Sequence, residues 1–350
     1  MTNSGHAMVG RAAARRLLDV AVTGVLAAAG CTGGSAGPQS LPWQQVSTLD
    51  LTGGTGRFDY QALDAGRGLL FVAHMGAGQL VEVDLTHHRV LRTVNDLPDV
   101  HGVIVVPEQR RVYATVTARN QLVALDEDSA ATVFTASTAA YPDGLAYDPL
   151  RHTVWSTNES AGNETVVDAG AGAVVATVPL GGDVGNVVYD PAIDRMVVAV
   201  QGRGDLAVVD PVSKSVVDRI ATPGCDHPHG QVLDNVHQVM FVGCEGNATL
   251  ATVDLAGRTV VDTLPVGDSP DVLAYDPPRG RVYVATESGW VSIADHDRGH
   301  LHARGSAHVA DGAHTVAVDP VTGQSYLPVA DNGHGTPQLW EYRPSAALSR

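Results

Sequence analysis

Histidine and aspartate residues recur at a regular interval along this 350-residue chain, and both residue types can bind metals or exchange protons. Successive members stand 42 to 44 residues apart, and we call them the His/Asp series: Asp59, His101, Asp143, Gly185, His229, Asp271 and His314. Imidazole suits zinc, copper or iron, whereas carboxylate suits calcium or magnesium. If the fold gathers the series, three members are candidate nitrogen ligands of a divalent metal ion: His101, His229 and His314.

The same residue types also have a purely structural explanation. Asp, His and Gly favour turns, so the series can instead hydrogen-bond the turns that open strands, with water filling the space between them. No spacing singles out a pair of carboxylates for acid/base catalysis. The chain also lacks a Gly-rich phosphate loop, a CxxC motif and a G-x-S-x-G nucleophile motif. Both interpretations of the series therefore stay open.

The interval itself predicts the fold. Five residues after each member of the series, an apolar run ends at a marker residue that is usually aspartate: Asp64, Val106, Asp148, Asp190, Asp234, Asp276 and Asp319. Each unit holds four short apolar runs, which in the third unit are 144–148, 153–157, 164–168 and 173–178. These runs are too short and too often broken by turn residues to be helices. Seven units of four strands predict an all-β, seven-bladed β-propeller.

The two ends of the chain predict how the ring closes. The last unit stops after residues 338–342 without a fourth strand, whereas residues 46–51 near the start resemble the fourth strand of other units. The N-terminal strand should therefore complete the last blade. We expect the propeller to span residues 45–344, followed by a C-terminal tail at 345–350.

A propeller makes the first strand of every blade line the central channel. The His/Asp series should then converge at one mouth of that channel, which we call the upper mouth. The loops between the second and third strands reach the same face. They add charged residues for which ordinary solvation is the simplest explanation: His74, Glu159, Glu245, Glu287, Asp331 and His334.

Several repeat segments resemble the YVTN-type (YncE-like) bacterial propeller repeats, and the resemblance covers residues 46–342. The segments that carry it are 142–149, 226–230 with 244–247, 281–286 and 312–320. The resemblance implies an exported propeller. For function it implies only a binding scaffold, because the fold by itself does not define an activity.

Residues 1–31 have the features of a bacterial export signal. A positively charged N-terminal region with Arg11, Arg15 and Arg16 comes first. It is followed by an apolar stretch that is too short to cross a membrane as a helix. Residues 25–31 resemble the lipobox of bacterial lipoproteins, which implies lipidation at Cys31; a plain cleaved signal is the alternative. The Gly/Ser/Pro-rich residues 32–44 should form a flexible tether. We expect an exported lipoprotein, anchored on the cell surface or in the periplasm.

Two further cysteines lie in the fifth unit. Cys225 precedes its first strand and Cys244 ends its second, so antiparallel pairing of these strands should bring both to the upper face. In an exported protein this placement predicts a disulfide. A pair of free thiols or a metal-binding role is the alternative.

Composition narrows the possible partners. The formal net charge is −16, which disfavours nucleic acid because an acidic surface repels a polyanion. We expect a monomer that binds a small ligand or an envelope protein at the upper mouth and is held at the membrane by its lipid. The alternative is a metal-dependent hydrolase of the lactonase kind that uses a channel ion to activate water.

Overall fold

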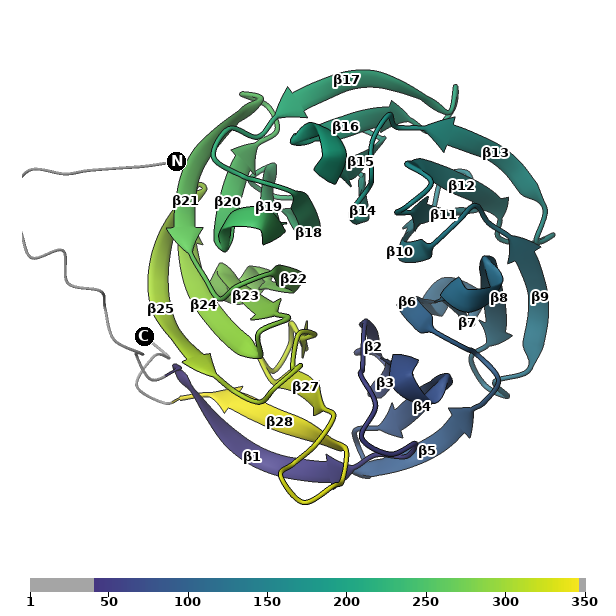
Figure 1. Ribbon diagram of the computed structural model, residues 1–350, viewed down its shortest axis with the longest axis vertical. Coiled ribbons are helices and arrows are strands. Elements are labelled where there is room, and N and C mark those ends of the chain that lie inside the picture. Colours follow the sequence, from purple (N-terminus) through teal and green to yellow (C-terminus); the bar gives the residue numbers. More distant parts are fainter. Residues whose placement is uncertain (1–40, 346–350) are drawn as a thin grey trace, which may run out of the picture. The chain divides into compact units, whose positions relative to one another are not determined.

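The computed structural model describes residues 41–345 and shows a ring of seven four-stranded antiparallel sheets (Figure 1). The predicted seven-bladed propeller is therefore confirmed. From the channel outwards, blade one consists of β2 (Gln61–Asp64), β3 (Leu69–His74), β4 (Gln79–Asp84) and β5 (Arg89–Val94). Blade two consists of β6 (Val100–Val106), β7 (Arg111–Val116), β8 (Gln121–Asp126) and β9 (Thr132–Ser137). Blade three consists of β10 (Pro142–Asp148), β11 (Thr153–Asn158), β12 (Asn163–Asp168) and β13 (Val174–Pro179).

The remaining blades repeat this order. Blade four consists of β14 (Val187–Asp190), β15 (Arg195–Val200), β16 (Asp205–Asp210) and β17 (Ser215–Ala221). Blade five consists of β18 (Pro228–Asp234), β19 (Val239–Cys244), β20 (Thr249–Asp254) and β21 (Thr259–Pro265). Blade six consists of β22 (Pro270–Asp276), β23 (Arg281–Thr286), β24 (Trp290–Asp297) and β25 (His300–His308). Blade seven consists of β26 (Ala317–Val318), β27 (Ser325–Val329), β28 (Gln338–Pro344) and β1 (Trp43–Asp50).

Short 3-10 turns join several of these strands: η1 (Met75–Ala77), η2 (Pro107–Gln109), η3 (Thr117–Arg119), η4 (Gln201–Arg203), η5 (Glu245–Asn247) and η6 (Pro277–Arg279). Within residues 41–345 no helix is long and apolar enough to span a membrane. The expected signal, the lipidation site Cys31 and almost all of the tether and tail lie outside the described residues.

The core lies between blades. Every residue of β3, β11 and β19 is buried, because each of these strands is covered on both faces by the neighbouring blades. Large side chains such as Phe71 and Trp155 fill these interfaces: Phe71 packs with Val112 of blade two, and Trp155 with Met196 of blade four. The outer strands are half exposed.

The marker aspartates hold the turn after each inner strand. Oδ1 of Asp148 accepts hydrogen bonds from the backbone N–H groups of Leu150, at 2.9 Å, and Arg151, at 3.2 Å. Asp234 makes the same contacts with Val236 and His237. A carboxylate that binds the backbone two and three residues ahead stabilises the turn locally, which explains why aspartate recurs at this point.

The ring closes through its N-terminal strand, as the sequence predicts. β1 pairs antiparallel with β28, with Leu49 opposite Leu339. The ring of Trp43 stacks on Tyr342 with 4.3 Å between centroids. The closing strand thus joins the two ends of the propeller in one sheet.

The predicted disulfide is confirmed, since Cys225 and Cys244 are bonded. Both cysteines are buried in the interface between blades four and five, where Cys225 lies just before β18 and Cys244 ends β19. The bond ties the loop that enters β18 to the neighbouring strand.

Replacing both cysteines by alanine should lower the free energy of unfolding by about 3 kcal/mol, because a loop of this length then regains its entropy in the unfolded chain. Urea unfolding of the two proteins, with and without reductant, measures the difference. Reductant should weaken the wild type and leave the double variant unchanged; equal unfolding midpoints for the two oxidised proteins would contradict the prediction.

Glu164 on β12 is fully buried, and neither of its carboxyl oxygens has a hydrogen-bond partner. Burial raises the pKa of this carboxyl well above its usual range. The folded protein therefore binds this proton more tightly than the unfolded chain does. The stability that this carboxyl contributes is fully present below the pKa that it has in the unfolded chain. It is lost as the pH rises from there towards the pKa that the carboxyl has in the folded protein.

The variant Glu164→Gln should consequently be more stable than the wild type at pH 8, with a smaller advantage at pH 5. Urea unfolding at the two pH values tests this, with Glu108→Gln on the exposed turn η2 as the matched control. A difference between wild type and Glu164→Gln that does not grow with pH would show that the carboxyl ionises in the folded state.

Candidate functional site

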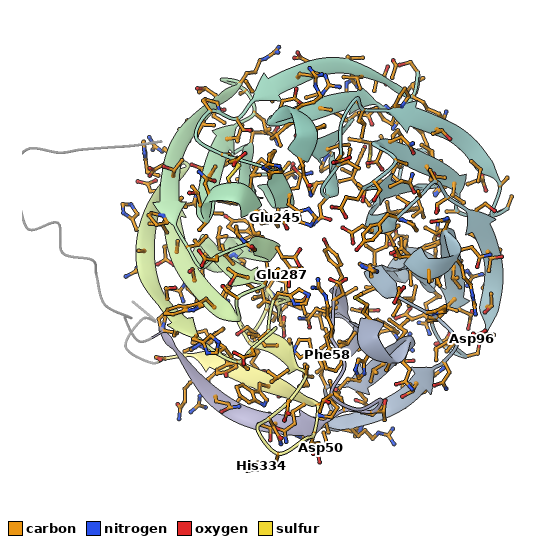
Figure 2. The ribbon with its side chains drawn as sticks, in the orientation of Figure 1. Asp50, Phe58, Asp96, Glu245, Glu287 and His334 are labelled. Carbon is orange, nitrogen blue, oxygen red and sulfur yellow. A yellow bond between two sulfur atoms is a disulfide. The ribbon has the colours of Figure 1, made fainter. Side chains whose placement is uncertain are left out.

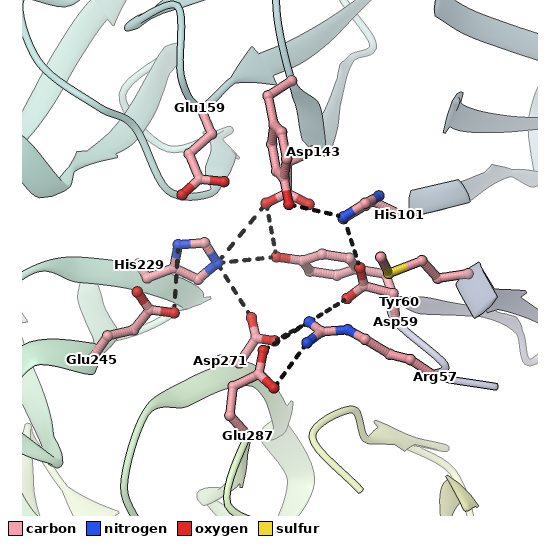
Figure 3. A pocket seen from close by; sticks show the side chains of 12 residues that line it. Arg57, Asp59, Tyr60, His101, Asp143, Glu159, His229, Glu245, Asp271 and Glu287 are labelled. Atoms are coloured by element: carbon pink, nitrogen blue, oxygen red, sulfur yellow. Dashed lines mark hydrogen bonds and ion pairs between the residues drawn. The ribbon is translucent and has the colours of Figure 1, made fainter. Parts of the chain in front are cut away.

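The His/Asp series converges at one mouth of the channel. A cavity of about 210 Å³ opens there, and five members of the series line it (Figure 3): Asp59, His101, Asp143, His229 and Asp271. The sixth, His314, lies just beneath them, and its Nε2 is 3.4 Å from Asp59 and 3.7 Å from Asp271. All six residues are at most 6% exposed. Whether they bind a ligand remains a prediction.

Irregular pairing aims these side chains into the channel. The register between first and second strands shifts at His101–Gly102, Asp143–Gly144, His229–Gly230 and Asp271–Val272. Such bulges turn a side chain out of the regular alternation of a strand. The glycines after the bulge also allow neighbouring inner strands to approach, since a Cβ on Gly230 would lie only 1.7 Å from the carbonyl oxygen of Asp271.

Each channel histidine is held by its Nδ1 atom. The Nδ1–H of His101 donates to the carbonyl of Asp99 at 2.8 Å, and that of His314 donates to the carbonyl of Gly312 at 2.9 Å. Nδ1 of His229 contacts the amide of Gln201. This fixes the ring orientation, so that Nε2 faces the carboxylates of the series.

Asp271 is the centre of the charge network. Its Oδ1 lies 3.2 Å from Nε2 of His229, and its Oδ2 lies 3.7 Å from Nε2 of His314. Asp59 lies between two histidines, with Oδ1 3.4 Å from His314 and Oδ2 3.6 Å from His101. Histidine and aspartate thus alternate around the mouth.

These contacts change the acidity of the groups. Burial alone lowers the pKa of His229, but the hydrogen bond and charge of Asp271 outweigh it and raise the pKa to about 10. Burial also acts to lower the pKa of His314, but the hydrogen bond to Asp59 and the charges of Asp271 and Asp59 outweigh it and raise the pKa to about 9. Burial and the charge of Asp59 raise the pKa of Asp143 to about 7. Burial acts to raise the pKa of Asp271, yet the hydrogen bond to His229 makes the net shift downward.

Three of the predicted loop residues reach the cavity. Glu159, Glu245 and Glu287 line it, and Figure 2 shows Glu245 and Glu287 beside the channel. Burial raises the pKa of Glu159 and of Glu245. These two are partly buried acids at the rim of an already acidic mouth.

The other three loop residues lie elsewhere. His74 is buried, stacks on Phe58 and donates to the carbonyl of Thr52 at 2.8 Å, so it supports the loop that enters β2. Asp331 accepts backbone hydrogen bonds within its own loop, and His334 lies at the outer edge of the molecule (Figure 2).

Sequence reasoning missed the residues next to Asp59. The guanidinium of Arg57 lies 2.7 Å from Glu287, 3.8 Å from Asp271 and 3.9 Å from Asp59. The hydroxyl of Tyr60 crosses the channel, where it donates to Asn186 at 2.9 Å and lies 3.4 Å from Asp143. Neither position repeats in the other units, so the periodic pattern carried no signal for them.

The fourth blade leaves room for Tyr60. Its member of the series is Gly185, packed so closely on His229 that a Cβ would lie 2.6 Å from the Cα of that residue. The following residue, Asn186, presents its amide to Tyr60 instead of a charge. The mouth is therefore asymmetric, and its charged groups come from the other six blades.

The three histidines proposed as metal ligands do not form one ligand group. Among residues 41–345, the groups of His, Cys, Asp and Glu close enough to share an ion each contain at most one of the three. They are Asp59 with Asp271 and His314; His229 with Glu245 and Asp271; and, away from the channel, Asp234 with His237 and His296. A carboxylate separates the histidines because the series alternates around the ring.

Comparison with known proteins shows a similarity of fold. No protein-family model matches the sequence, and no curated protein sequence matches it. The structure is similar to that of hydrazine synthase from Kuenenia stuttgartiensis, with a TM-score of 0.68 and 16% sequence identity over 85% of this chain and 96% of that chain. At this identity the likeness shows a shared propeller fold alone.

Proposed function

We propose that this protein is a binding protein that holds a small cation at the upper mouth of its channel. The observation that carries the proposal is an excess of buried and partly buried carboxylates around one small cavity. Six of them line it: Asp59, Asp143, Glu159, Glu245, Asp271 and Glu287. A propeller that binds through its channel mouth is consistent with the fold.

The cations of the site do not balance these acids. Arg57 carries one positive charge, and the raised pKa values of His229 and His314 add two more at neutral pH. Even if Asp143 keeps its proton part of the time, a negative charge remains in the mouth. Buried charge of one sign is costly unless it is compensated, so a bound cation would stabilise this arrangement.

The uncompensated charge is concentrated over blades three to five. The positive charge of Arg57 lies on the opposite side of the mouth, where it contacts Asp59, Asp271 and Glu287. Glu159 has no ion pair among the described residues, and Glu245 lies 4.0 Å from its nearest partner, His229. A cavity of about 210 Å³ accommodates a small amine or a metal ion with its water.

We further propose that the chain is exported and tethered to a membrane through Cys31, as a member of the YVTN-type propellers. The lipobox-like residues 25–31 and the repeat segments such as 142–149 support this. The disulfide between Cys225 and Cys244 is compatible with an oxidising compartment.

Binding is tested by calorimetric titration with small amines and divalent metal chlorides. We expect a stoichiometric complex that the double variant Glu159→Gln/Glu245→Gln weakens by about tenfold or more, since each lost charge acts in a partly desolvated site. Glu108→Gln on the exposed turn η2 is the matched control and should bind normally. Binding of anions in preference to every cation would refute the proposal.

The tether is tested by fractionating cells that express the full chain or Cys31→Ser. The wild type should sediment with membranes and be extracted only by detergent, whereas the variant should be soluble or secreted, because it lacks the lipid. Identical distribution of the two proteins would leave no role for Cys31 as an anchor.

The alternative of a metal-dependent hydrolase rests on the donor group Asp59, Asp271 and His314. Such an enzyme needs an ion with an open position for water. Metal binding at this group is therefore the property on which the hydrolase alternative depends.

A further inference from the structure

We propose that Asp59, Asp271 and His314 bind one divalent transition-metal ion at the floor of the channel mouth. This inference rests on the proposed function, because the acidic rim with Glu159 and Glu245 attracts cations into the mouth and the ion then binds at its floor, on the side of blades one, six and seven. The three residues come from loops and strands of blades one, six and seven, and each is at most 4% exposed. The channel holds one other group of the same composition, His229 with Glu245 and Asp271. In that group Glu245 is partly exposed and His229 already lies within hydrogen-bonding distance of Asp271, at 3.2 Å.

The distances between the donor atoms are long for hydrogen bonds, although the shorter one is still within hydrogen-bonding range, and they match the spacing of ligands that share an ion. Nε2 of His314 lies 3.4 Å from Oδ1 of Asp59 and 3.7 Å from Oδ2 of Asp271. A charge-assisted hydrogen bond would be about 2.8 Å long. Ligand atoms around a tetrahedral ion with bonds of about 2.1 Å stand about 3.4 Å apart. The observed gaps are therefore those of neighbouring ligands.

His314 already has the orientation of a metal ligand. Its Nδ1–H donates to the carbonyl of Gly312, which leaves Nε2 directed at the two carboxylates. Binding of the ion displaces the proton from Nε2, so it releases a proton to the solvent. Metal-binding histidines usually donate their second ring N–H to a carbonyl or carboxylate in this way, which fixes both tautomer and ring orientation.

Asp59 supplies a second, independent indication. Its Oδ2 is buried and makes no hydrogen bond, and the imidazole nitrogen it faces, Nε2 of His101, is 3.6 Å away. Leaving a buried carboxylate oxygen unpaired is unfavourable. An ion bound between Asp59 and Asp271 would compensate this charge directly.

Arg57 occupies the approach to the same position. Its Nη2 lies 3.9 Å from Oδ1 of Asp59 and 3.8 Å from Oδ2 of Asp271, the two oxygens that face His314. Glu287 holds the guanidinium at 2.7 Å. A metal ion and this guanidinium repel each other, so Arg57 should lower the affinity for the ion.

The group on the other side of the propeller fits an ion less well. His296 accepts a hydrogen bond at Nδ1 from the backbone of Gly299, at 3.3 Å, so its Nε2 carries the proton. That Nε2–H is engaged by close partners, with Asp234 at 3.1 Å and the hydroxyl oxygen of Tyr275 at 2.8 Å. Asp234, His237 and His296 are thus explained as a hydrogen-bonded cluster.

The donor set indicates the type of ion. One imidazole with two carboxylates suits Zn²⁺ or Mn²⁺, whereas Ca²⁺ takes six to eight oxygen ligands at longer distances. Among divalent ions Zn²⁺ should bind more tightly than Mn²⁺, as nitrogen ligands favour the later metal.

The test is calorimetric titration of the full-length, chelator-treated protein with ZnCl2, MnCl2 and CaCl2. We expect one Zn²⁺ per chain, weaker Mn²⁺ and no comparable Ca²⁺ binding. His314→Asn and Asp271→Asn should each weaken Zn²⁺ by about 100-fold or more, since they remove a direct ligand. Arg57→Met should bind Zn²⁺ several-fold more tightly, and because Arg57 is exposed this variant does not endanger folding.

Matched controls locate the ion. His334→Asn on an exposed loop should bind Zn²⁺ as the wild type does, and so should His237→Asn in the cluster on the other side. Loss of binding in His237→Asn but not in His314→Asn would overturn the assignment, as would weaker binding by Arg57→Met. Stoichiometric binding of an amine without any metal would refute this inference and leave the proposed function standing, whereas binding of no cation would refute both.

Discussion

Closure of the ring is the constraint on which the rest of the structure depends. Each blade is covered on both faces only if a neighbour stands on either side, and β1 supplies the missing strand of the last blade by pairing with β28. The first and last blades then share a core in which Leu70 and Val72 pack with Leu339. Because the ring is closed, the inner strands cannot move apart, and whatever side chains they carry at the mouth are held close together.

This constraint explains why so many charges are buried at one place. Repulsion among Asp59, Asp143 and Asp271 would separate them in a flexible loop. Here bulges turn Asp143 and Asp271 inwards, and the backbone N–H of Asp59 is held by the carbonyl of Ala73. The protein compensates part of the charge with its own groups, namely Arg57 and the channel histidines. What remains is an acidic mouth that favours cations, in agreement with the acidic character of the whole chain.

The periodic features could be read directly from the sequence. The marker aspartates recur because each binds the backbone of its own turn, as Asp148 does, and such a local interaction leaves a local signature. The disulfide followed from the antiparallel pairing of two adjacent strands. Arg57 and Tyr60 could not be found in this way, because they act across the channel on blades far away in sequence and have no counterparts in the other repeats.

The sequence by itself determined the propeller, its seven blades, its mode of closure and the place of the His/Asp series at the upper mouth, because all of these depend on interactions within one repeat or between the chain ends. Only the tertiary structure decided which of those residues meet. It separated His101, His229 and His314 from one another by carboxylates and grouped Asp59 and Asp271 with His314 instead. Distances across a channel depend on how all blades pack together, and no single stretch of sequence encodes them.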